Sequence, residues 1–230
     1  MHVLAKFRET AAGIGYWNTV LFALSRIAES VGGGRVRIVK YHITVQPVPA
    51  PADGYVRGGA FEMSFADKTS PLLADAGRPS HIIGSRFAQG ARCLVAANKG
   101  RLAGFLWFVV GPYDEDEVRV RFVPLPQGRA AWDFDVMVKP EYRMGRLFSY
   151  LWARAGAELR AQGVEHTVSR ISAFNAASLA SHGRLGARVV GSVFVLCAGS
   201  WQFMRTSFAP RWHLSRSPDK RPVVTILASH

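Results

Sequence analysis

The sequence predicts a mixed α/β fold, in which helices cover a mostly antiparallel central sheet. Hydrophobic residues make up 49% of the 230 residues, which is enough for a substantial core. Short strand-like segments joined by tight turns follow one another between residues 92 and 138, as in an antiparallel meander. From residue 132 to residue 204 strand and helix patterns alternate, and this order favours a sheet with helices packed on it.

The N-terminal region predicts one amphipathic helix and one strand. Apolar residues recur at spacings of three and four between residues 14 and 31, at Ile14, Trp17, Leu21, Leu24, Ala28 and Val31. Three glycines at 32–34 end this helix. The stripe predicts a helix packed on the domain, or alternatively one that touches a membrane surface with Trp17 and Phe22 at the interface. Residues 35–48 alternate as a strand, and a proline-rich loop follows.

The middle of the chain predicts a short strand at 61–65, helices at 70–76 and 79–89, and then four strands. These strands are expected at 93–97, 102–110, 118–123 and 132–138, in this order along the meander. The acidic run at residues 114–117 is expected to be a solvated hairpin tip. It is not read as a metal site, because nothing in the pattern fixes its carboxylates.

The last third predicts a helix at 147–162, a strand at 166–171, a helix at 175–184 and strands at 186–195 and 201–204. Residues 205–221 are rich in basic residues and are expected to be loosely ordered, with a further edge strand at 223–227. We therefore divide the chain into an N-terminal appendage (1–50), a main domain (51–204) and a basic tail (205–230).

The formal net charge of +13 predicts an anionic binding partner, such as nucleic acid, an anionic membrane surface, a phosphorylated ligand or an acidic protein. Cys93 and Cys197 are the only cysteines and lie in apolar runs, which indicates reduced thiols in a cytoplasmic protein, and no Cys/His cluster suggests zinc. The most apolar runs are too short to span a bilayer, and the N-terminus lacks the layout of a signal peptide. A cytoplasmic location is expected, with peripheral contact to the inner face of the membrane as an extension.

One stretch can bind a phosphate group. Residues 132–151 read as an apolar strand, a proline, a short basic turn with Gly145 and a helix. Such a junction presents backbone N–H groups at a helix N-terminus, and Arg143 and Arg146 add positive charge. The cradle is expected to comprise Arg143, Met144, Gly145, Arg146, Leu147 and Phe148.

Two stretches and the order of elements resemble the GNAT superfamily of acyl-CoA-dependent N-acyltransferases, over about residues 60–204. The first is VMVKPEYRMGR at residues 136–146, which is similar to the family's acyl-CoA motif, although Arg146 and Phe148 stand where the family has later glycine positions. The second is NAASLASHGRLGA at residues 175–187, which is similar to the family's later motif. The resemblance implies a GNAT-like fold and an acyl-CoA co-substrate, acetyl or long-chain, with no metal.

The resemblance also implies roles for single residues. The strand before the turn is expected to bulge near Met137 and Val138, where the family's backbone contacts the thioester. Asn175 and Ser178 occupy the later motif, so Asn175 would contact the cofactor arm or hold the strands apart, and it can also cap the short helix. His182 stands where the family often has a tyrosine, which makes it the candidate general acid for the CoA thiolate, or else a histidine on the helix surface.

An acyl transfer to an amine also needs a group that takes the amine proton. Asp133 and Asp135 lie two apart on one strand and are therefore expected on the same face, where one of them can serve, directly or through water. The alternative is that one pairs with an arginine. Glu62 and His81 are weaker alternates, and His42 is taken as structural.

The N-terminal helix and the basic tail exceed a minimal domain of this kind and suit an anionic membrane surface. They favour a lipophilic amine acceptor, sphingoid-like or otherwise long-chain, as in bacterial ceramide-synthase-like lipid N-acyltransferases. An acyl-carrier protein is the alternative donor. Acetylation of a small amine or a protein is the alternative reaction. From another class, the chain can be a basic nucleic-acid-binding module or a non-catalytic GNAT-like module. No nucleic acid is expected, because the basic residues are scattered along the chain without a known binding signature.

Overall fold

The computed structural model describes residues 10–49, 61–217 and 219–228. The chain forms two compact units, each assembled from segments that are distant in the sequence. Unit 1 comprises Met1–Gln46, Glu117–Arg121 and Ser169–Thr225, and unit 2 comprises Pro47–Asp116, Phe122–Val168 and Ile226–His230. The division of the chain at residues 50 and 204 stays a prediction.

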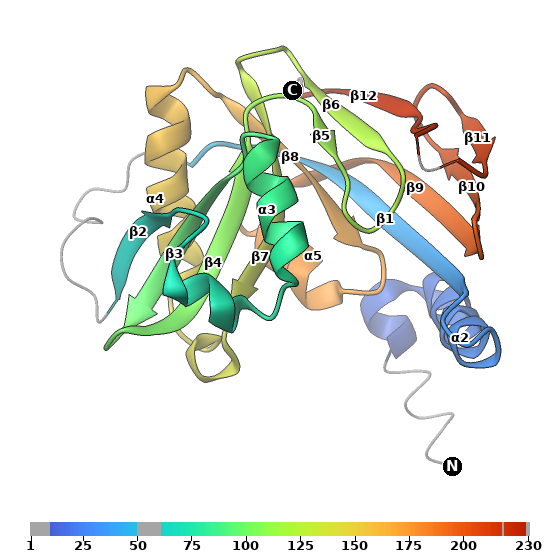
Figure 1. The fold of residues 1–230 in the computed structure, drawn as a ribbon, viewed down its shortest axis with the longest axis horizontal. Coiled ribbons are helices and arrows are strands. Elements are labelled where there is room, and N and C mark those ends of the chain that lie inside the picture. The colour runs from blue at the N-terminus through green and yellow to red at the C-terminus, as the bar shows by residue number, and fades with distance from the viewer. Residues whose placement is uncertain (1–9, 50–60, 218, 229–230) are drawn as a thin grey trace. The chain divides into compact units, whose positions relative to one another are not determined.

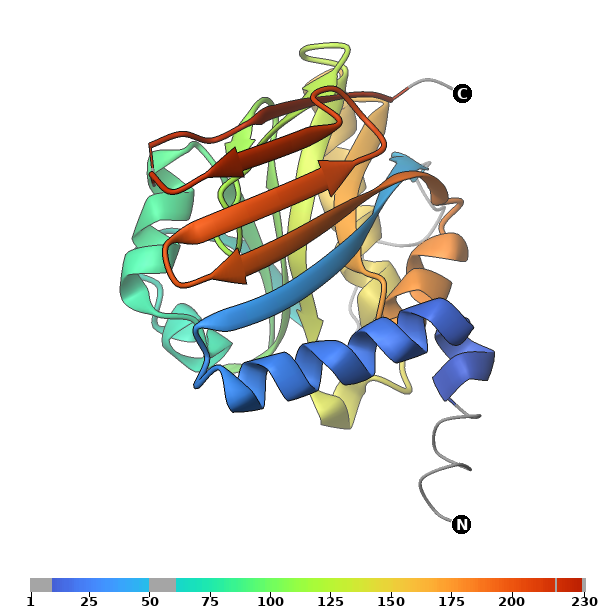
Figure 2. The ribbon, with the colours of Figure 1, turned by 90° about the vertical axis from the view of Figure 1, so that its right-hand side faces the viewer.

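Unit 1 is built on an antiparallel sheet. Its strand order is β11-β10-β9-β1, with β1 at Val36–Pro47, β9 at Arg188–Ala198, β10 at Trp201–Thr206 and β11 at Trp212–Ser215. Figure 2 shows the four strands side by side, with helix α2 (Tyr16–Val31) running next to them. Helix α5 (Ala176–Gly183) belongs to the same unit. One face of the sheet is buried by Val193, Val195 and Met204.

The basic tail is more ordered than the sequence predicts. Residues 212–215 form strand β11, in which Trp212 pairs with Arg205 and Ser215 with Gln202 of β10. The expectation of a loosely ordered segment at 205–221 is therefore wrong over this strand, because its backbone completes the edge of the unit 1 sheet. The predicted strand at 223–227 is confirmed as β12 (Val223–Leu227).

Unit 2 holds a second run of antiparallel strands, with the order β7-β4-β3-β2. These strands are β2 (Glu62–Ala66), β3 (Arg92–Asn98), β4 (Arg101–Val109) and β7 (Ala130–Val138). Helices α3 (Ser80–Ala88) and α4 (Leu147–Ala161) cover opposite faces of the run, and a short 3-10 helix lies at Pro71–Ala76 (Figures 1 and 2). Strand β8 (His166–Ser172) gives residues 166–168 to unit 2 and the rest to unit 1.

The predicted four-strand meander is interrupted. Strand β7 pairs directly with β4, whereas β5 (Tyr113–Asp114) and β6 (Arg121–Leu125) lie in a separate three-stranded sheet with β12. The strand expected at 118–123 is therefore shifted and is not the third strand of the meander. Its true partner, β12, is about a hundred residues away in the sequence, so local patterns do not indicate it.

The acidic run at residues 114–117 is also not a solvated tip. Only 2% of Glu115 is exposed, and Asp116 forms an ion pair with Arg86. Glu117 accepts a hydrogen bond from the Tyr41 hydroxyl over 2.6 Å. Protein cations and donors hold the carboxylates of Asp116 and Glu117. Within the described residues no group of three or more His, Cys, Asp or Glu side chains is placed to hold a metal ion.

Helix α2 does not bury the stripe that the sequence predicts. Trp17 is 79% exposed and Val31 84%, whereas Thr19 is buried and the side-chain amide of Asn18 accepts a hydrogen bond from Lys40 Nζ over 2.8 Å. Phe22 contacts Phe174, with 5.4 Å between the ring centroids. The helix thus packs through Asn18, Thr19 and Phe22, and Trp17, Leu24, Ile27 and Val31 form an exposed apolar stripe. Among the residues described, no helix is both long and apolar enough to cross a membrane.

Each unit contains one of the two cysteines. Cys93 lies in β3 of unit 2 and Cys197 in β9 of unit 1, and both are buried free thiols. Burial raises the pKa of the Cys93 thiol well above its ordinary value.

Candidate active site

A β-bulge in β7 is the main irregularity of the unit 2 sheet. Phe134 pairs with Trp107 of β4 and Met137 with Phe105, so that Asp135 and Val136 together oppose the single residue Leu106. Asp135 has a φ of 50°, a left-handed conformation that few residues other than glycine adopt. Such bulges redirect the strand and its side chains. The bulge expected near Met137 and Val138 lies immediately before them.

Two arginines hold the bulge. Arg78 donates to both carboxylate oxygens of Asp135, over 2.7 Å and 2.5 Å, and Arg86 donates over 2.6 Å. Arg86 is only 5% exposed and also pairs with Asp116. Its guanidinium lies 5.2 Å from the ring centroids of both Trp107 and Phe134. The left-handed residue is therefore fixed by a buried network of ion pairs and aromatic contacts.

This network argues against Asp135 as the group that takes the amine proton. Burial favours the protonated acid, but the hydrogen bonds from Arg78 and the charge and hydrogen bond of Arg86 outweigh it and lower the pKa of Asp135. A carboxylate with a lowered pKa and two guanidinium partners is a poor base near neutral pH. The alternative stated from the sequence, that one of the two aspartates pairs with an arginine, is the one that the structure matches.

The bulge also interrupts the alternation of side chains along β7, from which Asp133 and Asp135 were predicted to lie on one face. Arg86 contacts the consecutive residues Phe134 and Asp135, so these two side chains lie on the same side of the strand. Asp133 is 1% exposed and pairs in register with Phe108. Its role as a base stays a prediction.

The turn after β7 is compact and leads directly into α4. Lys139 donates its backbone N–H to Ala103, and a 3-10 turn covers Pro140–Tyr142. Gly145 donates its N–H to Tyr142 over 3.1 Å. The side chain of Arg143 folds back and donates through Nε to the Val138 carbonyl over 3.1 Å. One predicted cradle residue therefore also fixes the end of β7.

The N-terminus of α4 suits an anion. Arg146 is the N-cap residue, no side chain caps the helix, and the first turn contains no acidic residue. The first N–H groups of a helix lack partners inside it and carry partial positive charge. Arg143, Met144, Gly145 and Arg146 are exposed, whereas Leu147 is buried and Phe148 is half-buried. Four of the six cradle residues thus face solvent at the helix start, and Leu147 anchors it.

Gly104 of β4 allows the close packing beneath this junction. A Cβ atom at Gly104 would lie 2.7 Å from the carbonyl oxygen of Met137, and 3.3 Å from the Leu151 side chain. A contact of 2.7 Å with backbone cannot be relieved by a rotamer change. The glycine lets β4, the bulged end of β7 and α4 approach one another.

The residues of the later motif belong to unit 1. Asn175 is the N-cap of α5, and its side-chain oxygen accepts a hydrogen bond from the Ser178 N–H over 3.0 Å. The predicted N-cap role is confirmed, whereas contact of Asn175 and Ser178 with a cofactor arm stays a prediction.

His182 is not the histidine of a helix surface. It is 3% exposed, and its Nδ1 lies 3.2 Å from Oε1 of Gln46. Burial lowers the pKa of His182 to about 4, so the imidazole is neutral at pH 7. A neutral imidazole is a weak proton donor, which argues against His182 as the general acid.

No hydrogen bond or ion pair joins the weaker alternates Glu62 and His81 to Asp135 in the described part of the chain. Glu62 is exposed on β2, where it pairs with Ala97 at the far edge of the unit 2 sheet, and His81 is exposed on α3. His42 is half-buried on β1, and burial together with the charge of Lys40 lowers its pKa.

Sequence reasoning missed Arg78, Arg86 and Asp116, which determine the charge around the bulge. No local pattern indicates them, because Arg86 is 49 residues from Asp135 and 30 from Asp116. The one available signal was Arg86 itself, a charged residue among apolar neighbours in the predicted helix at 79–89. Gly104 was visible only as a glycine within a strand, which often marks a close backbone approach.

Solved structures with a similar fold exist, although no protein-family model and no curated protein sequence matches the chain. A conserved protein of unknown function from Staphylococcus epidermidis aligns with a TM-score of 0.50 and 12% identity, over 74% of this chain and 66% of that chain. A protein from Novosphingobium aromaticivorans assigned to the GNAT acetyltransferase family aligns with a TM-score of 0.50 and 17% identity, over 71% of this chain and 65% of that chain. The chain spans about two thirds of the length of each.

At these identities the likeness concerns the fold. The mixed α/β architecture, with a mostly antiparallel sheet flanked by helices, is that of GNAT acyltransferases, as the sequence predicts.

Proposed function

We propose that the protein is an enzyme, an N-acyltransferase of the GNAT type that transfers an acyl group from a CoA thioester to an amine. The observation that carries the proposal is the β7 bulge at Asp135 and Val136, followed within ten residues by the uncapped N-terminus of α4. A redirected strand and an anion-binding helix start, joined by a short turn, offer places for an acyl arm and for a pyrophosphate.

The fit to acyl-CoA rests on this chain's own groups. The exposed Arg143 and Arg146, together with the first N–H groups of α4, supply the positive charge and the hydrogen-bond donors that a pyrophosphate needs. The larger Arg146 and Phe148 in place of glycine leave the helix start intact, because Leu147 remains buried in the core. Acyl-CoA supplies the activated thioester carbonyl. Met137 and Val138 would position the acyl arm, and the Arg78–Asp135–Arg86 network keeps the bulge rigid.

For the amine proton, Asp133 is the remaining one of the two β7 aspartates. It is buried on β7, two residues before the bulge. A buried carboxylate can take a proton through an intervening water.

The acceptor is proposed to be lipophilic. The observation that favours this class is the exposed stripe Trp17, Leu24, Ile27 and Val31 on α2, which suits contact with a membrane surface. Acetylation of a small amine or a protein is the alternative. An acyl-carrier protein in place of CoA and a non-catalytic GNAT-like module are further alternatives that the following experiment separates.

The test is the thermal stability of the purified protein with acyl-CoAs from acetyl to palmitoyl. A ligand that binds the native state raises the midpoint, by about 2.7 kcal/mol of stabilisation at a hundred times its Kd. A rise that grows with chain length supports a lipophilic reaction, and a rise with acetyl-CoA alone supports acetylation of a small amine or protein.

Free CoA and the doubly substituted R143Q/R146Q protein are the controls. If no acyl-CoA raises the midpoint, the proposed donor is wrong. If CoA binds but thiol release with amine acceptors of either class never exceeds that of the buffer, the module is non-catalytic.

A further inference from the structure

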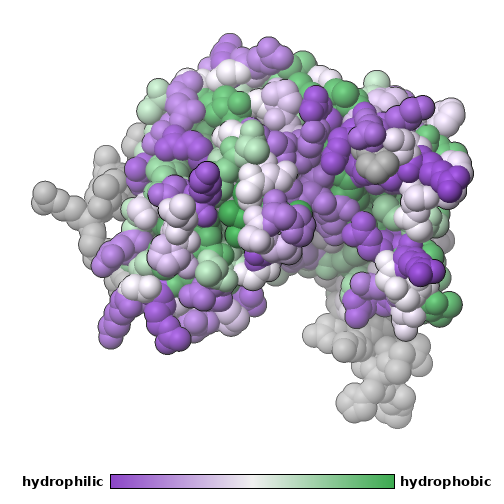
Figure 3. All heavy atoms as spheres, viewed as in Figure 1, coloured by the Kyte–Doolittle hydropathy of each residue, from purple (hydrophilic) through white to green (hydrophobic). Residues whose placement is uncertain are grey.

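The positive charge of the protein is concentrated in unit 1. Among its described residues, fourteen lysines and arginines stand against three acidic residues, whereas unit 2 has twelve against eleven. Figure 3 shows hydrophilic residues, with hydrophobic ones among them, on the part of the surface where β11 and β12 lie. The basic residues are scattered along the sequence, and folding gathers them into one unit.

The solvent-facing side of the unit 1 sheet alternates aromatic and cationic residues. The strand register aligns Lys40 of β1 with Phe194 of β9, Phe194 with Arg205 of β10, and Arg205 with Trp212 of β11. In the neighbouring row Leu196 aligns with Phe203. Residues opposite one another in antiparallel strands are direct neighbours, so a cation lies between two aromatic side chains.

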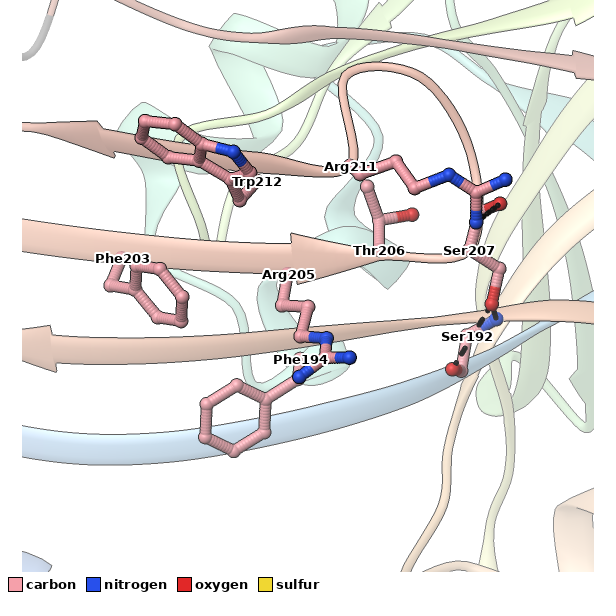
Figure 4. Close-up of a pocket in the computed structure, with 8 residues that line it drawn as sticks. All are labelled: Ser192, Phe194, Phe203, Arg205, Thr206, Ser207, Arg211 and Trp212. Carbon is pink, nitrogen blue, oxygen red and sulfur yellow. Dashed lines mark hydrogen bonds between the residues drawn. The ribbon is translucent and has the colours of Figure 1, made fainter.

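This side is hollowed into an open pocket of about 610 Å³ (Figure 4). It is lined by Ser192, Phe194, Phe203, Arg205, Thr206, Ser207, Arg211 and Trp212. The pocket therefore combines aromatic side chains, two guanidinium groups and three hydroxyls, without a carboxylate among the lining residues. Its volume is in the range of small-molecule sites.

The backbone around the pocket is fixed, while its key side chains are exposed. The Ser207 hydroxyl accepts a hydrogen bond from the Ser192 N–H over 3.1 Å, and Thr206 donates its N–H to the Arg211 carbonyl over 3.0 Å. Arg205 and Trp212 are exposed, with 68% of Trp212 accessible. Arg205 forms no ion pair with any residue in the described part of the chain.

We propose that this aromatic–basic face, defined by Phe194, Phe203, Arg205, Arg211 and Trp212, binds single-stranded nucleic acid. Unpaired bases stack on aromatic side chains and phosphates pair with arginines, and a sheet face that presents both is a stacking platform. A duplex is excluded from this mode, because its bases are already stacked.

The placement of the cations favours a nucleic acid over a lipid surface. Arg205 lies between Phe194 and Trp212 in the register, in the middle of the aromatic row. A membrane-binding surface instead has an apolar centre with cations at its margin. Alternating aromatic and cationic side chains match the alternation of base and phosphate along a strand. The inference concerns unit 1 alone and does not depend on acyl transfer.

The test is fluorescence anisotropy of a labelled twelve-nucleotide oligouridylate and its deoxythymidine counterpart, titrated with the full-length protein. Binding should weaken with salt, with a log–log slope of about −2 if three phosphates are neutralised. An unlabelled duplex of equal length should compete at least ten times less well, and uridine monophosphate should compete weakly.

Matched substitutions identify the face. W212A should weaken binding about tenfold and W212F little, because stacking needs only an aromatic ring. R205Q and R211Q should each weaken binding several-fold, whereas R101Q, an exposed arginine of unit 2, should change it less than twofold. Circular dichroism and the thermal midpoint of each variant verify folding.

Three results would overturn the proposal. One is no oligonucleotide binding at 50 mM salt. Another is oligonucleotide binding that W212A and R205Q leave unchanged, or for which the duplex competes as well as the single strand does. The third is sedimentation with vesicles of 30% phosphatidylserine that requires Arg205 and Trp212 while the oligonucleotide does not bind, which would assign the face to anionic lipid.

Discussion

Arg86 on α3 and Asp135 in β7 are joined by a hydrogen-bonded ion pair of 2.6 Å, between a guanidinium that is 5% exposed and a carboxylate on a residue with left-handed backbone. Arg86 binds Asp116 with its other donors. A charge that is removed from water in this way needs each of its partners. The pair therefore couples the stability of unit 2 to the geometry of the bulge.

Removing the Asp135 carboxylate should strongly destabilise the protein. D135N keeps the shape and tolerates the left-handed conformation, but it leaves Arg86 and Arg78 without one negative partner. We expect a loss of about 3 kcal/mol in the free energy of unfolding, measured by urea denaturation. R129Q breaks the exposed pair with Glu165 and should cost less than about 1 kcal/mol. Equal effects of the two substitutions would contradict a structural role for the buried network.

Two glycine-to-alanine substitutions should have opposite signs. G104A forces a Cβ to within 2.7 Å of the Met137 carbonyl and should destabilise the protein by more than about 1 kcal/mol, while weakening acyl-CoA binding. G84A adds a Cβ in the middle of α3, with nothing within 4 Å, and should stabilise by about 0.5–1 kcal/mol. Thermal denaturation measures both, and a G104A protein as stable as wild type would refute the close packing.

His182 should make the protein sensitive to acid. Its pKa is about 4 in the folded protein and about 6.5 when unfolded, so below pH 6.5 the unfolded chain binds the extra proton first. The stability contributed by the neutral imidazole is complete above pH 6.5 and is lost as the pH falls towards 4, by up to about 3 kcal/mol. Urea denaturation between pH 4 and 7.5 should show this slope, and H182Q should flatten it. An unchanged slope in H182Q would mean that other groups control the acid sensitivity.

Arg143 and Arg146 should contribute more to acyl-CoA affinity than to the fold. Both are exposed, so R146Q should change stability by less than about 0.5 kcal/mol, and R143Q, which removes the hydrogen bond to the Val138 carbonyl, by about 0.5–1.5 kcal/mol. Each should raise the Kd for acyl-CoA about tenfold, because each charge-assisted hydrogen bond to a phosphate contributes about 1.5–3 kcal/mol. Isothermal titration is done with acetyl-CoA and with S-acetylpantetheine, which has the same arm but no pyrophosphate. The comparison separates the effect on pyrophosphate binding from the effect on binding of the arm. Equal loss for both ligands would contradict the cradle.

Elements specified by local patterns were predictable from the sequence. The helix expected at 147–162 is α4 (Leu147–Ala161), because its leucine and alanine stripe matches one buried helix face. The strands expected at 93–97 and 102–110 are β3 and β4, joined by a tight turn in which Lys99 has a φ of 49°. In these segments side-chain spacing and turn chemistry act over fewer than ten residues.

Features that depend on distant partners were not predictable. The bulge at Asp135 exists because Arg78 and Arg86 reach it from other elements, and a strand pattern contains no sign of them. For α2, apolar residues spaced by three and four are compatible with burial of either of two neighbouring faces of the helix. The hydrogen bond between Asn18 and Lys40 lies on the packed face, and it is not visible in a hydrophobic pattern. Likewise the aromatic–basic face comes from three strands whose register only the fold determines.

The two buried cysteines allow the rate of local unfolding to be measured separately in each unit. Cys93 reports on the β3 region of unit 2 and Cys197 on the β9 region of unit 1, and the chain contains no other thiol. Reaction of each thiol with a chromogenic disulfide under native conditions requires transient exposure, so its rate measures how often that unit opens. With C93S and C197S variants the two rates separate. Acyl-CoA should then slow labelling at Cys93, and an oligonucleotide should slow it at Cys197.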